Sequence, residues 1–299
     1  MDEITQYIKQ LAENGEHSSS TLRSYSSDLR RLERYVFNAH NGSSGNSAWT
    51  VEQLLEFLDS EYDQGYKPST LHRRKISIIQ FADYLVESNI LHQNSLEQLS
   101  AWKPEIWHKI KQRELQFLSE EEIQLLCDTI LHHRSLRMYR DISIISVLLE
   151  TALSIDPIVK LNVSDLELRT LHVRVNLDKG YSLYPIPDSA DYLKNYLEKS
   201  RPELTQSANE EALFVSQMGS RITRQGVWQV IKGWGREAQL DTPISPRVLR
   251  HTAVVLMLKS GKSTIEIQKL LGHTNVFSTK ALIRKLEKSI ANNQLEVNK

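Results

Sequence analysis

Apolar residues in the first hundred positions recur at intervals of three and four, the spacing that places side chains on one face of a helix. The clearest run consists of Leu22, Tyr25, Leu29, Leu32 and Val36. Similar stretches follow it, and four short helices with brief connections predict a small helical bundle.

From residue 118 onward, helical spacing alternates with short strand-like runs. Ser119 and Glu122 have the spacing of a capping box ahead of an apolar helix. Two short runs of strand composition lie on either side of a turn at Lys179-Gly180 and predict a small sheet. A later helix is expected to place three residues in the core on one face: Trp228, Ile231 and Trp234.

These patterns predict a mainly α fold in two domains. The first is a helical bundle over residues 1–101, followed by a polar and basic linker over residues 102–117. The second, over residues 118–299, is mostly helical and α+β in character, with a small β-sheet.

Composition and charge predict where the protein is located and which class of partner it binds. With 40% hydrophobic and 25% charged residues the chain is typical of globular proteins. The single cysteine, Cys127, and an N-terminus without a signal-peptide pattern predict a cytoplasmic protein, and no apolar run is long enough for a membrane span.

The net charge is +0, yet residues 221–288 hold 13 Lys or Arg against 4 Asp or Glu. Such a segregated basic segment fits a nucleic-acid partner.

Five ordered stretches give this charge a context. They are TLRSYSSDL from Thr21, STLHRRKIS from Ser69, TALSIDPIVKLNVSDL from Thr151, PRVLRHT from Pro246 and LLGHT from Leu270. Together with FLSEEEI from Phe117, they resemble the motifs of tyrosine recombinases, which include phage integrases and Xer recombinases. The resemblance covers residues 4 to 288. It implies a SAM-like core-binding bundle followed by a recombinase catalytic-type domain.

The resemblance also implies a reaction. In that family a tyrosine hydroxyl attacks a DNA phosphodiester and forms a covalent 3′-phosphotyrosyl link. Two arginines and one or two histidines stabilise the transferring phosphoryl group, and a lysine on a β-hairpin acts as general acid. No metal and no cofactor take part. The partner that this implies is double-stranded DNA.

Only two of six family positions match by identity, Arg250 and His273. His251 follows the arginine in the usual way and is expected to be structural. Lys179 is a weak candidate for the hairpin lysine. The remaining family positions hold other residues, with Ser154 for the first arginine, Ser182 for the lysine, Arg247 for a histidine and Leu282 for the tyrosine.

The missing tyrosine does not depend on alignment, because no tyrosine follows Tyr196. Ser278 and Thr279 carry hydroxyl groups nearby, but the sequence shows no base that would activate them. Strand cleavage by this chain alone is therefore not expected.

Three hypotheses follow. The first is a DNA-binding protein on a degenerate recombinase scaffold. The second is a recombinase that takes its tyrosine in trans from a paralogous partner, and the third is a protein-interaction module that no longer binds DNA. The possible protein partners are therefore a catalytically competent paralogous recombinase and a second copy of this chain. Cys127, His132 and His133 lack a second ligand pair, so no metal site is expected.

Seven residues are the candidates for DNA contact: Arg73, Arg74, Arg221, Arg224, Lys232, Arg247 and Arg250.

Overall fold

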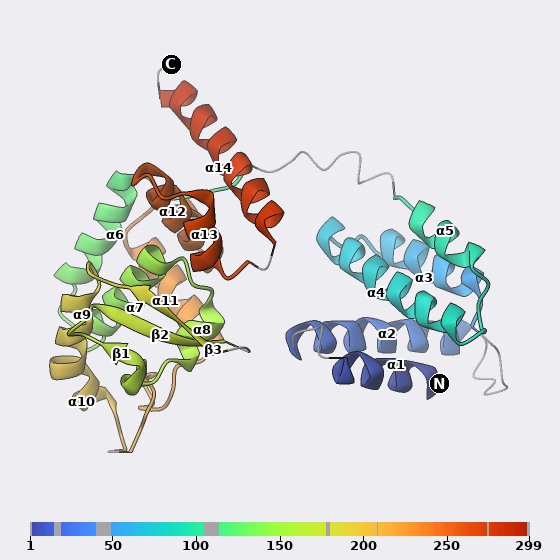
Figure 1. The fold of residues 1–299 in the computed structure, drawn as a ribbon, viewed down its shortest axis with the longest axis horizontal. Coiled ribbons are helices and arrows are strands. Elements are labelled where there is room, and N and C mark those ends of the chain that lie inside the picture. The colour runs from blue at the N-terminus through green and yellow to red at the C-terminus, as the bar shows by residue number, and fades with distance from the viewer. Residues whose placement is uncertain are drawn as a thin grey trace. The chain divides into compact units, whose positions relative to one another are not determined.

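The structure is a computed structural model that describes residues 2–14, 19–39, 49–104, 114–177, 180–207, 209–273 and 275–297 (Figure 1). The chain divides into two compact units, residues 1–113 and 114–299. Within the described residues, no helix is long and apolar enough to cross a membrane.

The first unit is a bundle of five described helices, one more than the sequence predicted. They are α1 (Asp2–Glu13), α2 (Ser19–Ala39), α3 (Val51–Asp63), α4 (Pro68–Glu87) and α5 (Asn94–Ala101). The apolar run predicted between Leu22 and Val36 lies on α2, where Leu29 and Leu32 are fully buried against α3 and α4. Thr50 caps α3 through a capping box, and a proline begins α4.

The second unit begins with α6 (Glu120–His132), α7 (Met138–Thr151) and α8 (Ile155–Lys160), followed by the short 3₁₀ helix η2 (Val163–Asp165). Its sheet is antiparallel in the order β1 (Leu166–Glu167), β2 (His172–Leu177) and β3 (Gly180–Pro185). The helices α9 (Ala190–Asn195), η3 (Tyr196–Ser200) and α10 (Arg201–Leu204) follow. The last helices are α11 (Arg224–Glu237), α12 (Pro246–Lys259), α13 (Thr264–Leu271) and α14 (Val276–Val297).

The core of the second unit forms around α7, which is buried along most of its length and packs on α6, α9 and α12. A separate apolar cluster joins α12, α13 and α14, which lie together in Figure 1. The mainly α fold with a small three-stranded sheet is confirmed.

The predicted capping box is confirmed at the start of α6. Ser119 Oγ accepts from the backbone N–H of Glu122 at 3.1 Å, and the Glu122 carboxylate accepts from the backbone N–H of Ser119 at 2.9 Å. The core position expected for Trp228 is wrong, since its ring is 40% exposed whereas Trp234 is 9% exposed. Lys232 Nζ lies 4.5 Å from the Trp228 ring centroid, so a cation–π contact covers part of the ring.

Residues 114–117, at the end of the predicted linker, are part of the second unit and pack against its last helices. Leu115 and Phe117 contact the apolar cluster of α12 to α14. The carbonyl oxygen of Gln116 lies 3.0 Å from His251 Nδ1, which donates to it because a carbonyl can only accept. His251 is 6% exposed, which agrees with a structural role.

Candidate nucleic-acid interface

Two arginines one turn apart begin α12. Ser245 caps the helix by accepting a hydrogen bond from the backbone N–H three residues later at 3.2 Å, and Pro246 occupies the first turn. This start places Arg247 on the surface and Arg250 in a partly buried position. Both arginines lie within the first two turns of α12, where the positive end of the helix dipole favours an anion.

Arg250 carries a charge that no described carboxylate neutralises. Its Nη2 donates to the carbonyl oxygen of Leu271 at 2.8 Å, and no ion pair involves it within the described ranges. Burial lowers the pKa of Arg250, and the nearby phenol of Tyr184 opposes this shift. A partly buried cation held by a neutral acceptor is a site that an anion would stabilise.

His273 lies next to this arginine. It follows Gly272, which ends α13 in the left-handed conformation with φ 67°. Burial lowers the pKa of His273, and the charge of Arg250 lowers it further. The imidazole is therefore neutral at pH 7, and the two positions that match the family motif meet in one place.

The hydroxyl of Thr279 contacts this histidine, with His273 Nδ1 and Thr279 Oγ1 2.9 Å apart. The interpretation that no base lies near this hydroxyl is thus wrong. Sequence spacing did not reveal that Thr279, in the first turns of α14, lies beside His273. Thr279 is fully buried. A buried hydroxyl that holds an imidazole in place orients the ring rather than exposing itself to a substrate.

The positions that differ from the family pattern have other surroundings. Ser154 is exposed at the N-cap of α8 and makes no side-chain capping bond. Ser182 lies on β3 opposite Val175 of β2. Leu282 packs against the apolar cluster of α12 to α14. Lys179 lies outside the described residues.

Arg221 is committed to contacts inside the second unit. Its Nη1 donates to two carbonyl oxygens, each at 2.9 Å, and its Nη2 donates to a side-chain oxygen at 2.5 Å. These acceptors belong to Val159, Leu161 and Asn162. Its proposed contact with DNA competes with this structural role, which the sequence did not indicate.

The exposed face of α11 carries the other candidates of the second unit. Arg224 Nη1 forms an ion pair with Asp156 Oδ1 at 3.0 Å, and both side chains are about half exposed. Trp228 and Lys232 follow at intervals of four, so an exposed aromatic ring lies between two cations. This face of α11 is therefore exposed and carries both cationic and aromatic side chains.

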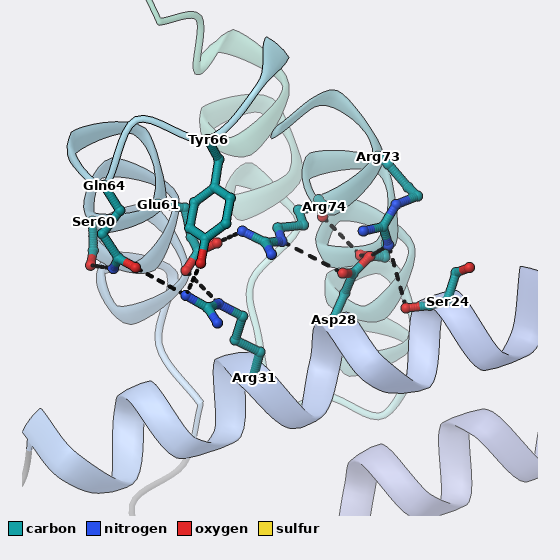
Figure 2. Close-up of polar contacts among 10 residues, drawn as sticks. Ser24, Asp28, Arg31, Ser60, Glu61, Gln64, Tyr66, Arg73 and Arg74 are labelled. Atoms are coloured by element: carbon teal, nitrogen blue, oxygen red, sulfur yellow. Dashed lines mark hydrogen bonds and ion pairs between the residues drawn. The ribbon is translucent and has the colours of Figure 1, made fainter. Parts of the chain in front are cut away.

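In the first unit, Arg73 and Arg74 take part in a network of ion pairs that joins α2, α3 and α4 (Figure 2). The Arg74 side chain is 9% exposed, pairs with Glu61, and lies 3.6 Å from Asp28. Arg74 is therefore an internal residue, in disagreement with the exposed position that a DNA contact requires. Arg73 pairs with Asp28 while its side chain stays 40% exposed.

A further arginine completes the network and was missed by sequence reasoning. Arg31 Nε donates to Glu61 Oε1 at 2.8 Å, and its Nη2 donates to Tyr66 Oη at 2.7 Å. The one-turn spacing of Asp28 and Arg31 is visible in the sequence, but the distant carboxylate of Glu61 is not. The network therefore became evident only from the packing of the helices.

The histidines near Cys127 do not gather around a metal. His132 Nδ1 lies 2.7 Å from the carbonyl oxygen of Asp128, and the ring of His133 packs edge-on against Trp234 at 5.2 Å. Within the part of the chain that the structure describes, no group of three or more His, Cys, Asp or Glu could hold a metal ion.

Comparison with known proteins agrees with this arrangement. Residues 116–288 match the phage integrase family, and residues 4–89 match the phage integrase N-terminal SAM-like domain. The tyrosine recombinase XerD of Oceanobacillus iheyensis is 30% identical over 88% of this chain and 86% of its own length. The tyrosine recombinase XerC of Herpetosiphon aurantiacus is 26% identical over 93% of this chain and 88% of its own length.

Solved structures share the fold at lower identity. The Tn1549 transposon integrase bound to a circular intermediate DNA is 17% identical, with a TM-score of 0.71 over 94% of both chains. XerH recombinase in a post-cleavage complex with a difH substrate is 18% identical, with a TM-score of 0.70 over 93% of this chain and 80% of that one. The family matches, which together span most of the sequence, lead to one conclusion: the chain belongs to the tyrosine recombinase, or phage integrase, family.

Proposed function

We propose that this protein binds duplex DNA and does not cleave it on its own. One observation carries the proposal: Arg250 and His273 meet in an anion-suited site, while the position of the family's tyrosine is occupied by Leu282, packed against an apolar cluster. The site keeps groups that hold a phosphate and lacks the group that attacks it.

Charge and family both support the choice of DNA as the partner. Residues 221–288 combine 13 basic with 4 acidic residues, and this segment contains α11, α12 and α13. Arg247, Arg224 and Lys232 extend the cationic surface beyond the Arg250 site. Cations that contact phosphates release counterions, so the affinity is expected to fall steeply with salt. A DNA partner also fits the cytoplasmic location expected from the sequence.

Cleavage by this chain alone is not expected, because two groups that the reaction requires are missing. An arginine that stabilises phosphoryl transfer is worth roughly 10³ to 10⁵ in rate, and Ser154 occupies the first arginine position. Leu282 offers no nucleophile, which removes the covalent route. Thr279 does not replace it, because its hydroxyl is fully buried against His273.

The proposal is tested with one titration and one trapping assay. Fluorescence anisotropy with a random-sequence duplex measures affinity over a series of salt concentrations, and a nicked suicide duplex traps any covalent adduct on a denaturing gel. Salt-dependent binding without an adduct is expected. A covalent adduct on this chain would overturn the proposal that it does not cleave DNA. An absence of binding at low salt would overturn the proposal of DNA binding and leave the hypothesis of a protein-interaction module.

The retained Arg250 and His273 also favour a second candidate, a recombinase subunit that receives its tyrosine in trans from a paralogous partner. Its test mixes this chain with a competent recombinase in which the catalytic arginine corresponding to Arg250 has been replaced, so that only this chain can supply that group. An adduct on the partner that forms only in the mixture, and is lost with Arg250→Ala in this chain, supports that candidate. No adduct in the mixture leaves DNA binding alone.

A further inference from the structure

The second unit contains a cavity of about 690 Å³ that none of the sites described above uses. Its walls are the first turn of α7, the turn over residues 216–220 and one face of α11. Cavities of about 300 to 1,000 Å³ have the size that small organic ligands occupy. Arg250, and the exposed cations Arg224 and Lys232 of α11, do not line it. The cavity is therefore separate from the candidate nucleic-acid interface.

A buried ion pair forms the floor of this cavity. Arg140 and Asp141 are 2% and 4% exposed, and Arg140 Nε and Nη2 lie 2.8 and 2.7 Å from Asp141 Oδ1. The other carboxylate oxygen, Asp141 Oδ2, accepts from Trp234 Nε1 at 2.9 Å. Arg140 Nη1 donates to the carbonyl oxygen of Val215, so two of its five N–H groups have no partner among the described residues. Because the carboxylate is already bonded on both oxygens, the floor offers hydrogen-bond donors to a ligand.

A second cation lies at the same end of the cavity. Arg137 is the N-cap residue of α7, is exposed, and pairs with no described carboxylate. Its side chain makes no capping bond, and the positive end of the helix dipole favours an anion at this position. Arg137 and Arg140 are three residues apart, so they lie on the same side of the first turn. Two guanidinium groups at a helix start suit the oxygens of a phosphate.

The wall formed by α11 contains a glycine that packing within the unit does not explain. A Cβ at Gly226 would lie 2.9 Å from Ile222 Cγ1, and one at Gly235 would overlap Ile244 Cγ2, so both of these glycines are required by their neighbours. A Cβ at Gly233 would meet no described atom within 4 Å. Glycine in a helix interior is less stable than alanine. Gly233 therefore weakens α11 without an internal reason, and it leaves bare backbone at the cavity wall.

Another wall carries an exposed methionine on a hydrogen-bonded turn. Met218 is 73% exposed, and its backbone N–H donates to Ser216 Oγ at 3.1 Å. The N–H of Ser216 donates to the carbonyl oxygen of Ser220 at 2.7 Å, and Gly219 adopts a φ of 74° that favours glycine. A thioether makes favourable contacts with an aromatic ring. Met218 and the bare backbone at Gly233 are therefore suited to the two sides of a flat ring.

Amide side chains distinguish between kinds of ring. Gln225 and Gln229 are exposed, line the cavity, and lie one turn apart on α11. An amide carries both donors and acceptors, which pair with the edges of nucleobases. A hydrocarbon ring would leave these groups unpaired, whereas a nucleobase presents donors and acceptors along its edge.

We infer that this cavity binds a 5′-mononucleotide. The phosphate contacts Arg137 and the spare donors of Arg140, and the base lies between Met218 and the backbone of α11 at Gly233. Gln225 and Gln229 contact the edge of the base. The inference goes beyond the proposed function and does not rest on DNA binding, because it concerns other residues.

Isothermal titration calorimetry of the full chain with AMP tests the binding. A dissociation constant of about 10 µM to 1 mM is expected for a ligand of this size. Adenosine and inorganic phosphate, which each supply half of the contacts, are expected to bind at least about tenfold more weakly. An absence of binding up to about 5 mM AMP would overturn the inference. Adenosine that binds as tightly as AMP would refute the phosphate contact.

Gly233→Ala separates the ligand site from a structural role, because stability and binding should move in opposite directions. Alanine improves the helix, so the melting temperature is expected to rise by about 2 to 4 °C. The added methyl group occupies the place of the base, so AMP affinity is expected to fall by at least about tenfold. In NMR spectra, the indole N–H resonance of Trp234 should shift with AMP in the wild type and not in the variant. Unchanged AMP affinity in Gly233→Ala would refute the site.

Arginine variants test the phosphate contact. Arg137→Ala is expected to weaken AMP binding by about fivefold to tenfold and to leave adenosine binding unchanged. Arg134→Ala is the matched control, because Arg134 is exposed in the preceding turn and does not line the cavity. Equal losses in the two variants would contradict the contact. Arg250→Ala should leave AMP affinity unchanged, and a loss there would assign the nucleotide to the Arg250 site and overturn this one.

Discussion

Replacing Arg221 separates a structural arginine from a DNA-binding one. In Arg221→Ala, Leu161 O keeps a partner because the backbone N–H of Leu213 also donates to it at 2.9 Å. Val159 O and Asn162 Oδ1 lose the charged donor that each accepts from at 2.9 and 2.5 Å. A partly buried acceptor left without its donor costs about 1 kcal/mol or somewhat more, so the loss for two is about 2 to 3 kcal/mol.

This loss has a measurable thermal counterpart. For a unit of this size each kcal/mol lowers the melting temperature by about 2 to 4 °C, so Arg221→Ala is expected to melt about 5 to 10 °C below the wild type. The matched variant is Arg224→Ala, which breaks one half-exposed ion pair with Asp156. Such a surface pair contributes about 0 to 1 kcal/mol, so little change in melting temperature is expected there.

Urea and thermal unfolding followed by circular dichroism measure both variants, and anisotropy with duplex DNA is recorded below the melting transition. Arg221→Ala should be less stable yet bind DNA with nearly wild-type affinity and salt slope. Arg224→Ala should keep its stability and lose part of its affinity. The reverse result for Arg221→Ala, unchanged stability with weakened binding, would refute the structural interpretation and restore the contact predicted from the sequence.

Three further outcomes are expected. Burial lowers the pKa of His251 in the folded state. The stability contributed by the neutral imidazole is therefore fully present above about pH 6.5 and is lost as the pH falls through the lower folded pKa. In thermal unfolding, the melting temperature of His251→Gln should fall less steeply with acid pH than that of the wild type. Thr279→Val removes the hydroxyl bonded to His273, so the tautomer populations of the His273 imidazole measured by NMR should move toward those of a free imidazole, and unchanged populations would contradict the orienting role. Leu282→Tyr alone should form no adduct on a nicked suicide duplex, because Ser154 still occupies the first arginine position; an adduct would show that a nucleophile was the only group lacking.

The parts of the fold that local patterns determine could be predicted from the sequence. The capping box at Ser119 and the hairpin of β2 and β3 depend on residues close together in the chain, and both appear as expected. Trp228 was misplaced because helical spacing identifies a face of α11 without showing whether a neighbour covers it. Whether a face becomes core is decided by tertiary packing, which spacing alone does not contain.

The same division applies to the candidate site. Motif spacing matched Arg250 and His273 to two family positions, and the structure places these residues near the start of α12 and just after the end of α13. It gave no sign that Arg74 is internal, since its partner Glu61 comes from another helix. Exposure of an arginine depends on distant carboxylates, so a basic motif predicts charge near DNA better than it predicts which side chain makes the contact.

Arg250 and His273 also have a role that does not depend on DNA. Arg250 joins α12 to the end of α13 through Leu271 O, and His273 joins α13 to α14 through Thr279. Each role uses only part of the side chain, because Arg250 commits one Nη2 hydrogen to Leu271 and His273 contacts Thr279 through Nδ1. The remaining guanidinium donors and His273 Nε2 are compatible with a phosphate. The bonds that fix the last three helices therefore also hold the two groups that an anion would meet, whereas Ser154 and Leu282 supply neither a charge nor a nucleophile.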